Sequence, residues 1–90
     1  SNPAIFPIIK HDDSEVSSFL AACEKIRNKY PSSVFFSTDP SASFSSQIKY
    51  SKKLNDKIAI IINNDQILIK HHNNEDVTEI DSSELDNFLE

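Results

Sequence analysis

The sequence has 90 residues, enough for one small domain with a modest core. Its net charge is −5, from 14 acidic and 9 basic residues, and it has no basic stripe, so we expect no nucleic-acid partner. No apolar run reaches the length of a membrane span, so we expect no membrane contact by this domain. The single cysteine, Cys23, cannot form an internal disulfide and leaves the cell compartment open.

Both ends of the sequence suggest a piece of a longer protein. It contains no methionine, and Ser1 and Asn2 are interpreted as the remnant of a cleaved tag. The last residues, from Leu85 onward, still have a helical pattern. We therefore expect residues 1–90 to form a single domain, excised from a parent chain whose neighbouring domains contact it.

The first third of the chain predicts a strand followed by a helix. Residues 5–9 form an apolar run, in which Pro7 removes one ladder donor and predicts a bulge or one unpaired side. Asp12 with Glu15 matches a capping box at a helix start. The apolar residues that follow are spaced by three and four, as on one face of an amphipathic helix: Val16, Phe19, Leu20, Cys23, Ile26 and Tyr30. Pro31 ends this helix.

The middle of the chain predicts a buried strand over residues 33–37 and then a turn over 38–41 that offers helix caps. A weaker helix is expected over residues 42–52, with Phe44 and Ile48 four apart on its inner face. Five nearby serines lower its helix propensity. The alternative is a polar loop that Phe44 holds in place.

The last third predicts a hairpin and a closing helix. Residues 57–62 and 66–70 have strand patterns, and the intervening Asn63-Asn64-Asp65 favours a tight turn. Residues 77–80 extend or re-enter the sheet edge. Asp81 with Glu84 repeats the capping-box pattern, and the stripe of the final helix is formed by Leu85, Phe88 and Leu89.

The element order is therefore βαβαββα. A right-handed parallel βαβ unit followed by an antiparallel hairpin predicts a four-stranded mixed sheet of order 2-1-3-4. Continuous apolar strands favour helices on both faces of the sheet. The predicted fold class is α/β, with a thioredoxin-like core.

Three stretches of apolar pattern, together with the hairpin, resemble the non-catalytic b-type domains of the protein disulfide isomerase family: residues 8–10 leading into 18–26, residues 34–38, and residues 83–89. The resemblance implies a scaffold or a weak binder of unfolded polypeptide within a chaperone-like folding factor of the endoplasmic reticulum lumen. The alternative is a thioredoxin-like adaptor that holds a protein complex together in the cytoplasm or nucleus.

Redox-active relatives carry Cys-x-x-Cys where the first strand meets the first helix, because the helix N-terminus lowers the thiol pKa there. Residues 10–14 instead read Lys-His-Asp-Asp-Ser. These relatives also have a cis-proline before the third strand, whereas residues 54–57 contain no proline. We therefore expect a redox-inactive domain that is not an enzyme, whatever a parent protein catalyses elsewhere. A redox enzyme that uses Cys23 alone is the third reading.

Other candidate chemical groups have simpler explanations. Cys23 is expected to be a buried, inert side chain rather than a sensor thiol. His71 and His72 are adjacent on a strand and point to opposite faces, so with His11 they predict no metal site. The carboxylates near helix starts are explained by capping. The serines of residues 37–46 have no adjacent histidine. No cofactor is expected.

The remaining candidate site is apolar. Phe44, Ile48 and Tyr50 belong to the weakest predicted helix, where burial is least assured. In some domains of the resembled family, the corresponding region contributes to a groove for unfolded polypeptide. These three residues are therefore the predicted peptide-binding site, and the alternative places Phe44 and Ile48 in the core.

Overall fold

The computed structural model describes residues 4–37 and 42–89, so the predicted turn over 38–41, Ser1 and Asn2 lie outside the described residues. These residues form a small α/β domain with a five-stranded mixed sheet. The elements follow in the order β1 (Phe6–Lys10), α1 (Val16–Lys29), β2 (Val34–Phe36), α2 (Phe44–Leu54), β3 (Ile58–Asn63), β4 (Gln66–His71), β5 (Val77–Ile80), the 3-10 turn η1 (Ser82–Leu85) and α3 (Asp86–Leu89).

The sheet has the strand order β2-β1-β3-β4-β5. Strand β1 pairs in parallel with β2 and β3, and β4 is antiparallel to β3 and β5. The predicted order of the first four strands is correct. The prediction of only four strands is wrong, because residues 77–80 pair with β4 in a regular ladder that aligns Ile80 with Ile67. The α/β class is confirmed, whereas a thioredoxin fold is not.

Pro7 lies in a central strand without a bulge. The β1–β2 register is continuous and aligns Pro7 with Phe35. The ladder between β1 and β3 begins one residue later, at Ile8 opposite Ile60. The missing N–H of Pro7 therefore falls outside the β3 ladder, which explains how a proline is tolerated in this strand.

Helix α1 begins three residues later than the Asp12 capping box predicts. Its N-cap is Glu15, which makes no side-chain capping bond. The helix start is instead tied to the β3–β4 hairpin. Asn64 N donates to Ser14 Oγ (3.0 Å), and Glu15 N donates to Asn64 Oδ1 (3.3 Å). These contacts join residues 50 and 49 positions apart in sequence, which no local pattern reveals, so the boundary prediction failed.

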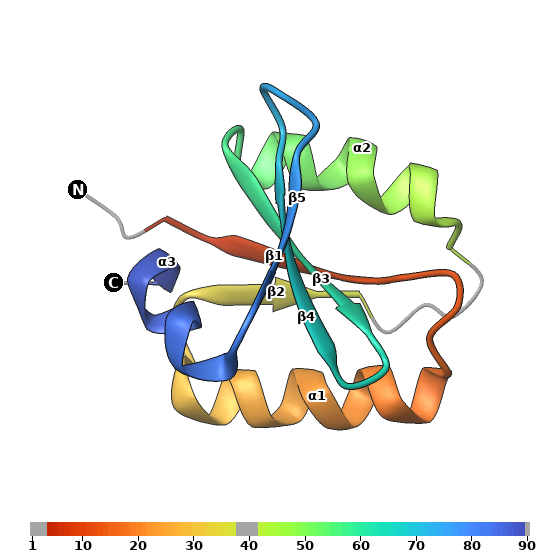
Figure 1. The fold of residues 1–90 in the computed structure, drawn as a ribbon, viewed down its shortest axis with the longest axis vertical. Coiled ribbons are helices and arrows are strands. Elements are labelled where there is room, and N and C mark those ends of the chain that lie inside the picture. The colour runs from red at the N-terminus through yellow and green to blue at the C-terminus, as the bar shows by residue number, and fades with distance from the viewer. Residues whose placement is uncertain (1–3, 38–41, 90) are drawn as a thin grey trace.

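The sheet is covered by α2 on one face and by α1 and α3 on the other (Figure 1). The larger core lies on the α1 face and consists of buried residues from the sheet and both helices: Ile8, Phe19, Cys23, Ile26, Ile58, Ile60, Ile62, Ile69, Ile80, Leu85 and Leu89. Two residues of the predicted α1 stripe lie outside this core, because Val16 is 41% and Leu20 36% exposed.

Helix α2 is a true helix, so the loop alternative is wrong. Its N-cap Ser43 accepts a hydrogen bond from Ser46 N through Oγ (3.2 Å). The only buried residue described in α2 is Ser51. Ile9, Ala59 and Ile61 of the sheet are buried outside the α1-face core, but α2 leaves part of its underside open, and the candidate site lies there.

The chain turns and ends were predicted with more success. The hairpin turn uses Asn64 at a positive φ of 55°, a conformation that asparagine tolerates. Asp81 and Glu84 form the predicted capping box, in which Asp81 N donates to Glu84 Oε1 (3.2 Å). The final helix starts as a 3-10 turn and buries Leu85 and Leu89.

Candidate functional site

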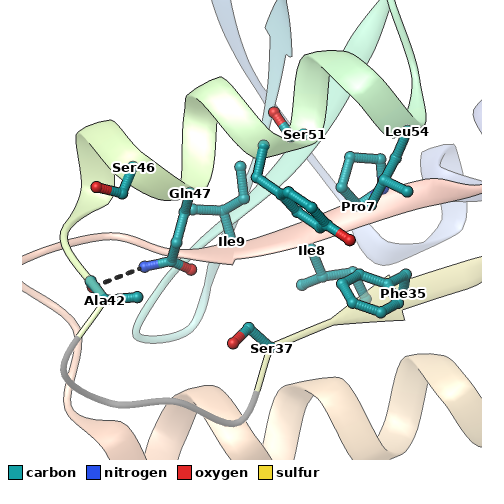
Figure 2. A pocket seen from close by; sticks show the side chains of 11 residues that line it. Pro7, Ile8, Ile9, Phe35, Ser37, Ala42, Ser46, Gln47, Ser51 and Leu54 are labelled. Carbon is teal, nitrogen blue, oxygen red and sulfur yellow. Dashed lines mark hydrogen bonds between the residues drawn. The ribbon is translucent and has the colours of Figure 1, made fainter.

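An apolar groove lies between α2 and the β1–β2 side of the sheet (Figure 2). It has a volume of about 320 Å³. Strand β1 forms its floor, Phe35 of β2 one wall, and Tyr50 and Leu54 of α2 the other. The residues that line it are Pro7, Ile8, Ile9, Phe35, Ser37, Ala42, Ser46, Gln47, Tyr50, Ser51 and Leu54.

Polar side chains inside the groove are already hydrogen-bonded. Gln47 Nε2 donates to the carbonyl of Ala42 (3.1 Å), as the dashed line in Figure 2 shows, and Gln47 Oε1 accepts from Lys10 N (3.4 Å). Ser51 Oγ donates to the carbonyl of Ile48 (2.7 Å). The interior of the groove therefore offers apolar contact, while its polar atoms hold α2 in place.

An aromatic pair marks the mouth of the groove. The rings of Phe35 and Tyr50 lie 6.0 Å apart with an interplanar angle of 49°. Phe35 is 41% and Tyr50 52% exposed. The two exposed rings therefore lie side by side at one hollow, unlike the exposed Val16 and Val77 on other elements.

The predicted peptide-binding residues are separated by the fold. Tyr50 lines the groove, whereas Phe44 and Ile48 are absent from its lining. Phe44 is half-buried against the ring of His11, with centroids 5.5 Å apart, and Ile48 is half-buried on α2. Sequence analysis missed Phe35, because a residue within an apolar strand pattern is expected to be buried. Peptide binding at the three predicted residues stays a prediction.

Lysines gather at the C-terminal end of α2. Between Phe44 and Asn55 the chain has three lysines and no carboxylate. A hollow at this end is lined by Lys52, Lys53 and Lys57, together with Asp56. Lys70 of β4 lies close enough to His72, as does Lys52, to lower the pKa of that histidine. We call Lys52, Lys53, Lys57 and Lys70 the lysine cluster.

His72 connects this cluster to the packing of α2. Its Nε2 lies 3.5 Å from Ser51 Oγ, and its backbone N donates to the carbonyl of Lys57 (2.9 Å). His72 Nδ1 is buried and has no hydrogen-bond partner. Burial first, and then Lys52 and Lys70, lower the pKa of His72 below 6.5, so this imidazole is neutral at neutral pH.

The contact between Ser51 and His72 resembles a nucleophile–base pair, but its geometry serves packing. Ser51 is 1% exposed, and its hydroxyl donates to the Ile48 carbonyl. A serine nucleophile must donate to its base and be open to a substrate. Neither condition holds, so the pair positions α2 on β4.

Cys23 lies in the core at 0% exposure, as predicted. Burial raises the pKa of its thiol to about 12. A thiolate is the reactive form of cysteine, so this environment suppresses nucleophilic chemistry. The reading in which Cys23 alone supports a redox reaction is not favoured by this position.

The predicted acidic and histidine clusters do not converge on one point. Within residues 4–37 and 42–89, no group of three or more His, Cys, Asp or Glu side chains could hold a metal ion. His11 accepts from Asp13 N through Nδ1 (3.1 Å), and its ring packs against Phe44 at a tilt of 50°. Among the described residues, no helix is long and apolar enough to cross a membrane.

The lysine cluster is the main feature that sequence reasoning missed. A net charge of −5 describes the whole chain and hides a local excess of positive charge. Four of the nine basic residues lie between Lys49 and Lys57, a concentration that a count by element would have found. The proximity of Lys70 required the β3–β4 pairing and was not visible in the local sequence.

A scan against protein-family models finds no match, and no curated protein matches the chain. Among solved structures, the chain is similar to part of the apo histidyl-tRNA synthetase of S. aureus. The match has a TM-score of 0.70 and 15% identity, and it covers 100% of this chain and 27% of the synthetase. At this identity the likeness shows the fold alone, and the chain spans about a quarter of the matched protein.

This match corrects three predictions. The resemblance to the protein disulfide isomerase family is wrong, because the full-length structural match is to a tRNA synthetase. The associated description as a thioredoxin-like chaperone of the endoplasmic reticulum has no support in the comparisons. The expectation of no nucleic-acid partner conflicts with this match, which is to a protein named as a tRNA synthetase, and is withdrawn. Simple apolar patterns fit many α/β domains, which explains the misassignment.

Proposed function

We propose that this domain binds RNA through the lysine cluster and is a binding module rather than a catalyst. The observation that carries the proposal is the concentration of lysines at the end of α2, on a fold shared with part of a histidyl-tRNA synthetase. Transfer RNA is the first ligand class to test, because it is the RNA for which the matched protein is named.

Electrostatics support this surface as the contact. Binding to a phosphate backbone depends on local positive charge, because each neutralised phosphate releases a counterion. The helix dipole alone favours lysines in the last turn of α2, which accounts for Lys52 and Lys53. It does not account for Lys57, which follows the helix and lines the same hollow as Lys52. It also does not account for Lys70 of β4, which lies near His72, as Lys52 does.

The absence of catalysis is part of the proposal. The buried Cys23 thiol has a raised pKa, and the Ser51 hydroxyl is engaged by a backbone carbonyl. The groove lined by Phe35 and Tyr50 presents apolar surface rather than a pair of titratable groups in different environments.

The test is fluorescence anisotropy with labelled tRNA at about 50 mM salt. We expect weak but measurable binding by the wild type. At this salt concentration the double variant Lys52→Ala/Lys57→Ala should bind tRNA more weakly by about tenfold or more, because it lacks two lysine–phosphate contacts. Both side chains are exposed, so the variant should fold normally.

The matched control is Lys25→Ala. Lys25 is exposed on α1, on the opposite face of the sheet. Its loss removes one positive charge, as the single variant Lys52→Ala does, but should leave the affinity for tRNA unchanged. Equal weakening by Lys25→Ala and Lys52→Ala would show that net charge alone decides binding, and no binding by the wild type would refute the proposal.

A further inference from the structure

The groove opens beside an edge strand. Strand β2 is at one end of the sheet order and pairs, among the described strands, only with β1. Phe35, its central residue, lies on the α2 side of the sheet, where it contacts Tyr50. A peptide added alongside β2 in extended form would place every second side chain on this side, directly over the groove.

The groove interior favours an apolar side chain. Its floor and walls come from Pro7, Ile9, Phe35 and Leu54, and the polar atoms of Gln47 already have partners. A nucleobase in this position would find few free donors or acceptors to read its edge. An aliphatic or aromatic side chain needs none, and the exposed aromatic rings provide the contact area that dominates such sites.

The rim of the groove carries positive charge. Lys53 lies three residues after Tyr50 on α2, so the two side chains are neighbours on the helix surface. Lys49 lies one turn before Lys53, on the outer side of the helix. Both lysines are exposed, and neither forms an ion pair with a described residue. Helix α2 has no carboxylate to compensate them. The rim is therefore complementary to acidic side chains.

We propose that this groove docks an extended acidic segment of a partner protein. One apolar side chain of the segment fills the groove against Phe35 and Tyr50, and a flanking carboxylate lies near Lys53. The segment adds to the edge of β2 that no other described strand covers. The apolar contacts of this site are separate from the proposed RNA contacts, whereas Lys53 is shared with the lysine cluster.

The experiment titrates three octapeptides into the isotopically labelled domain and follows the amide resonances. All three have a central Leu-Phe pair, flanked by glutamates, by glutamines or by lysines. We expect the glutamate peptide to shift resonances of β2 and of residues 46–54, with a Kd in the micromolar range that suits a small shallow groove. The glutamine peptide should bind about tenfold more weakly, and the lysine peptide should not bind.

Variants separate the apolar and the charged contributions. Tyr50→Ser should weaken the glutamate peptide by about tenfold, as expected for an aromatic anchor. Lys53→Glu should weaken binding of the glutamate peptide and strengthen binding of the lysine peptide. The matched control is Val77→Thr, at an exposed apolar residue of β5 on the opposite edge, which should change nothing. Lys52→Ala/Lys57→Ala should also leave peptide binding intact, which separates this site from RNA binding.

Three results would overturn the proposal. One is equal binding of the three peptides, which would show that charge at the rim is irrelevant. Another is a shift pattern outside β2 and α2. The last is displacement of the glutamate peptide by an oligouridine that also shifts the amide resonances of Phe35 and Tyr50. The groove would then be part of the RNA-binding surface.

Discussion

At the scale of single residues, His72 couples charge to packing. Its side chain lies between Ser51 of α2 and the lysine cluster. Its Nδ1 atom is buried and has no hydrogen-bond acceptor for an added proton. Protonation therefore places a third cation beside Lys52 and Lys70 without a compensating hydrogen bond, and the carboxylate of Asp56 offsets this only in part. The structure tolerates this histidine because it stays neutral.

The pH dependence of stability follows from that environment. The folded pKa of His72 is lower than its ordinary value of 6.5, so the unfolded chain takes up a proton at higher pH than the folded domain does. The contribution of His72 to stability is complete above about pH 6.5, falls as the pH drops below it, and levels off below the folded pKa. The free energy of unfolding, measured with urea, should fall more between pH 7.5 and pH 5 for the wild type than for His72→Gln. Identical losses would contradict this role.

Cys23 provides a second prediction at this scale. Its burial and its pKa of about 12 leave almost no thiolate at neutral pH. A thiol reagent such as dithionitrobenzoate should label the native domain slowly, at the rate at which the core opens. Labelling should become fast in urea. Fast labelling of the native domain would revive the reading of Cys23 as a reactive thiol.

At the scale of elements, α2 decides where both proposed surfaces lie. It carries lysines on its outer face and at its end, and one side of it forms a wall of the groove. The only side-chain N-cap among its described residues is the hydrogen bond in which Ser46 N donates to Ser43 Oγ. An element with so little buried apolar surface is sensitive to the loss of such a cap.

Removing that cap gives the prediction for this element. Ser43→Ala should lower the free energy of unfolding by about 1 kcal/mol, the usual cost of losing a serine N-cap. Ser45→Ala, at an exposed position in the first turn, removes a similar hydroxyl and should be neutral or slightly stabilising. Chemical unfolding of both variants measures the difference. A neutral Ser43→Ala would mean that α2 is held by other contacts.

The elements also show what the sequence could and could not predict. Continuous apolar runs predicted β1, β3 and β4, and the Asn-Asp turn predicted the hairpin, because these signals are local. The start of α1 was misplaced because Asn64 holds it from across the sheet. Strand β5 was underestimated because its residues are mostly exposed and only Ile80 is buried. The groove depends on how α2 meets β2, which no local pattern encodes.

At the scale of the whole molecule, charge is segregated. The chain is acidic overall, yet four of its nine basic residues lie between Lys49 and Lys57. The segment after β4 is acidic, with seven carboxylates from Glu75 to the C-terminus. This segregation is incomplete in the fold, because Asp56 lines the same hollow as Lys52, Lys53 and Lys57, and the backbone of Asp76 accepts a hydrogen bond from His71, the residue after Lys70. We therefore expect RNA binding through the lysine cluster to be weak and strongly dependent on salt.

The salt dependence of RNA binding tests the central claim most directly. Anisotropy titrations of labelled tRNA between 50 and 200 mM salt should give a slope of log K against log salt of about −2 to −3, as expected for three or four phosphate contacts. Lys52→Ala/Lys57→Ala should reduce the magnitude of the slope by about 1 to 2, whereas Lys25→Ala should leave it unchanged. A wild-type slope near zero, or the same slope in all three proteins, would contradict RNA binding through the lysine cluster.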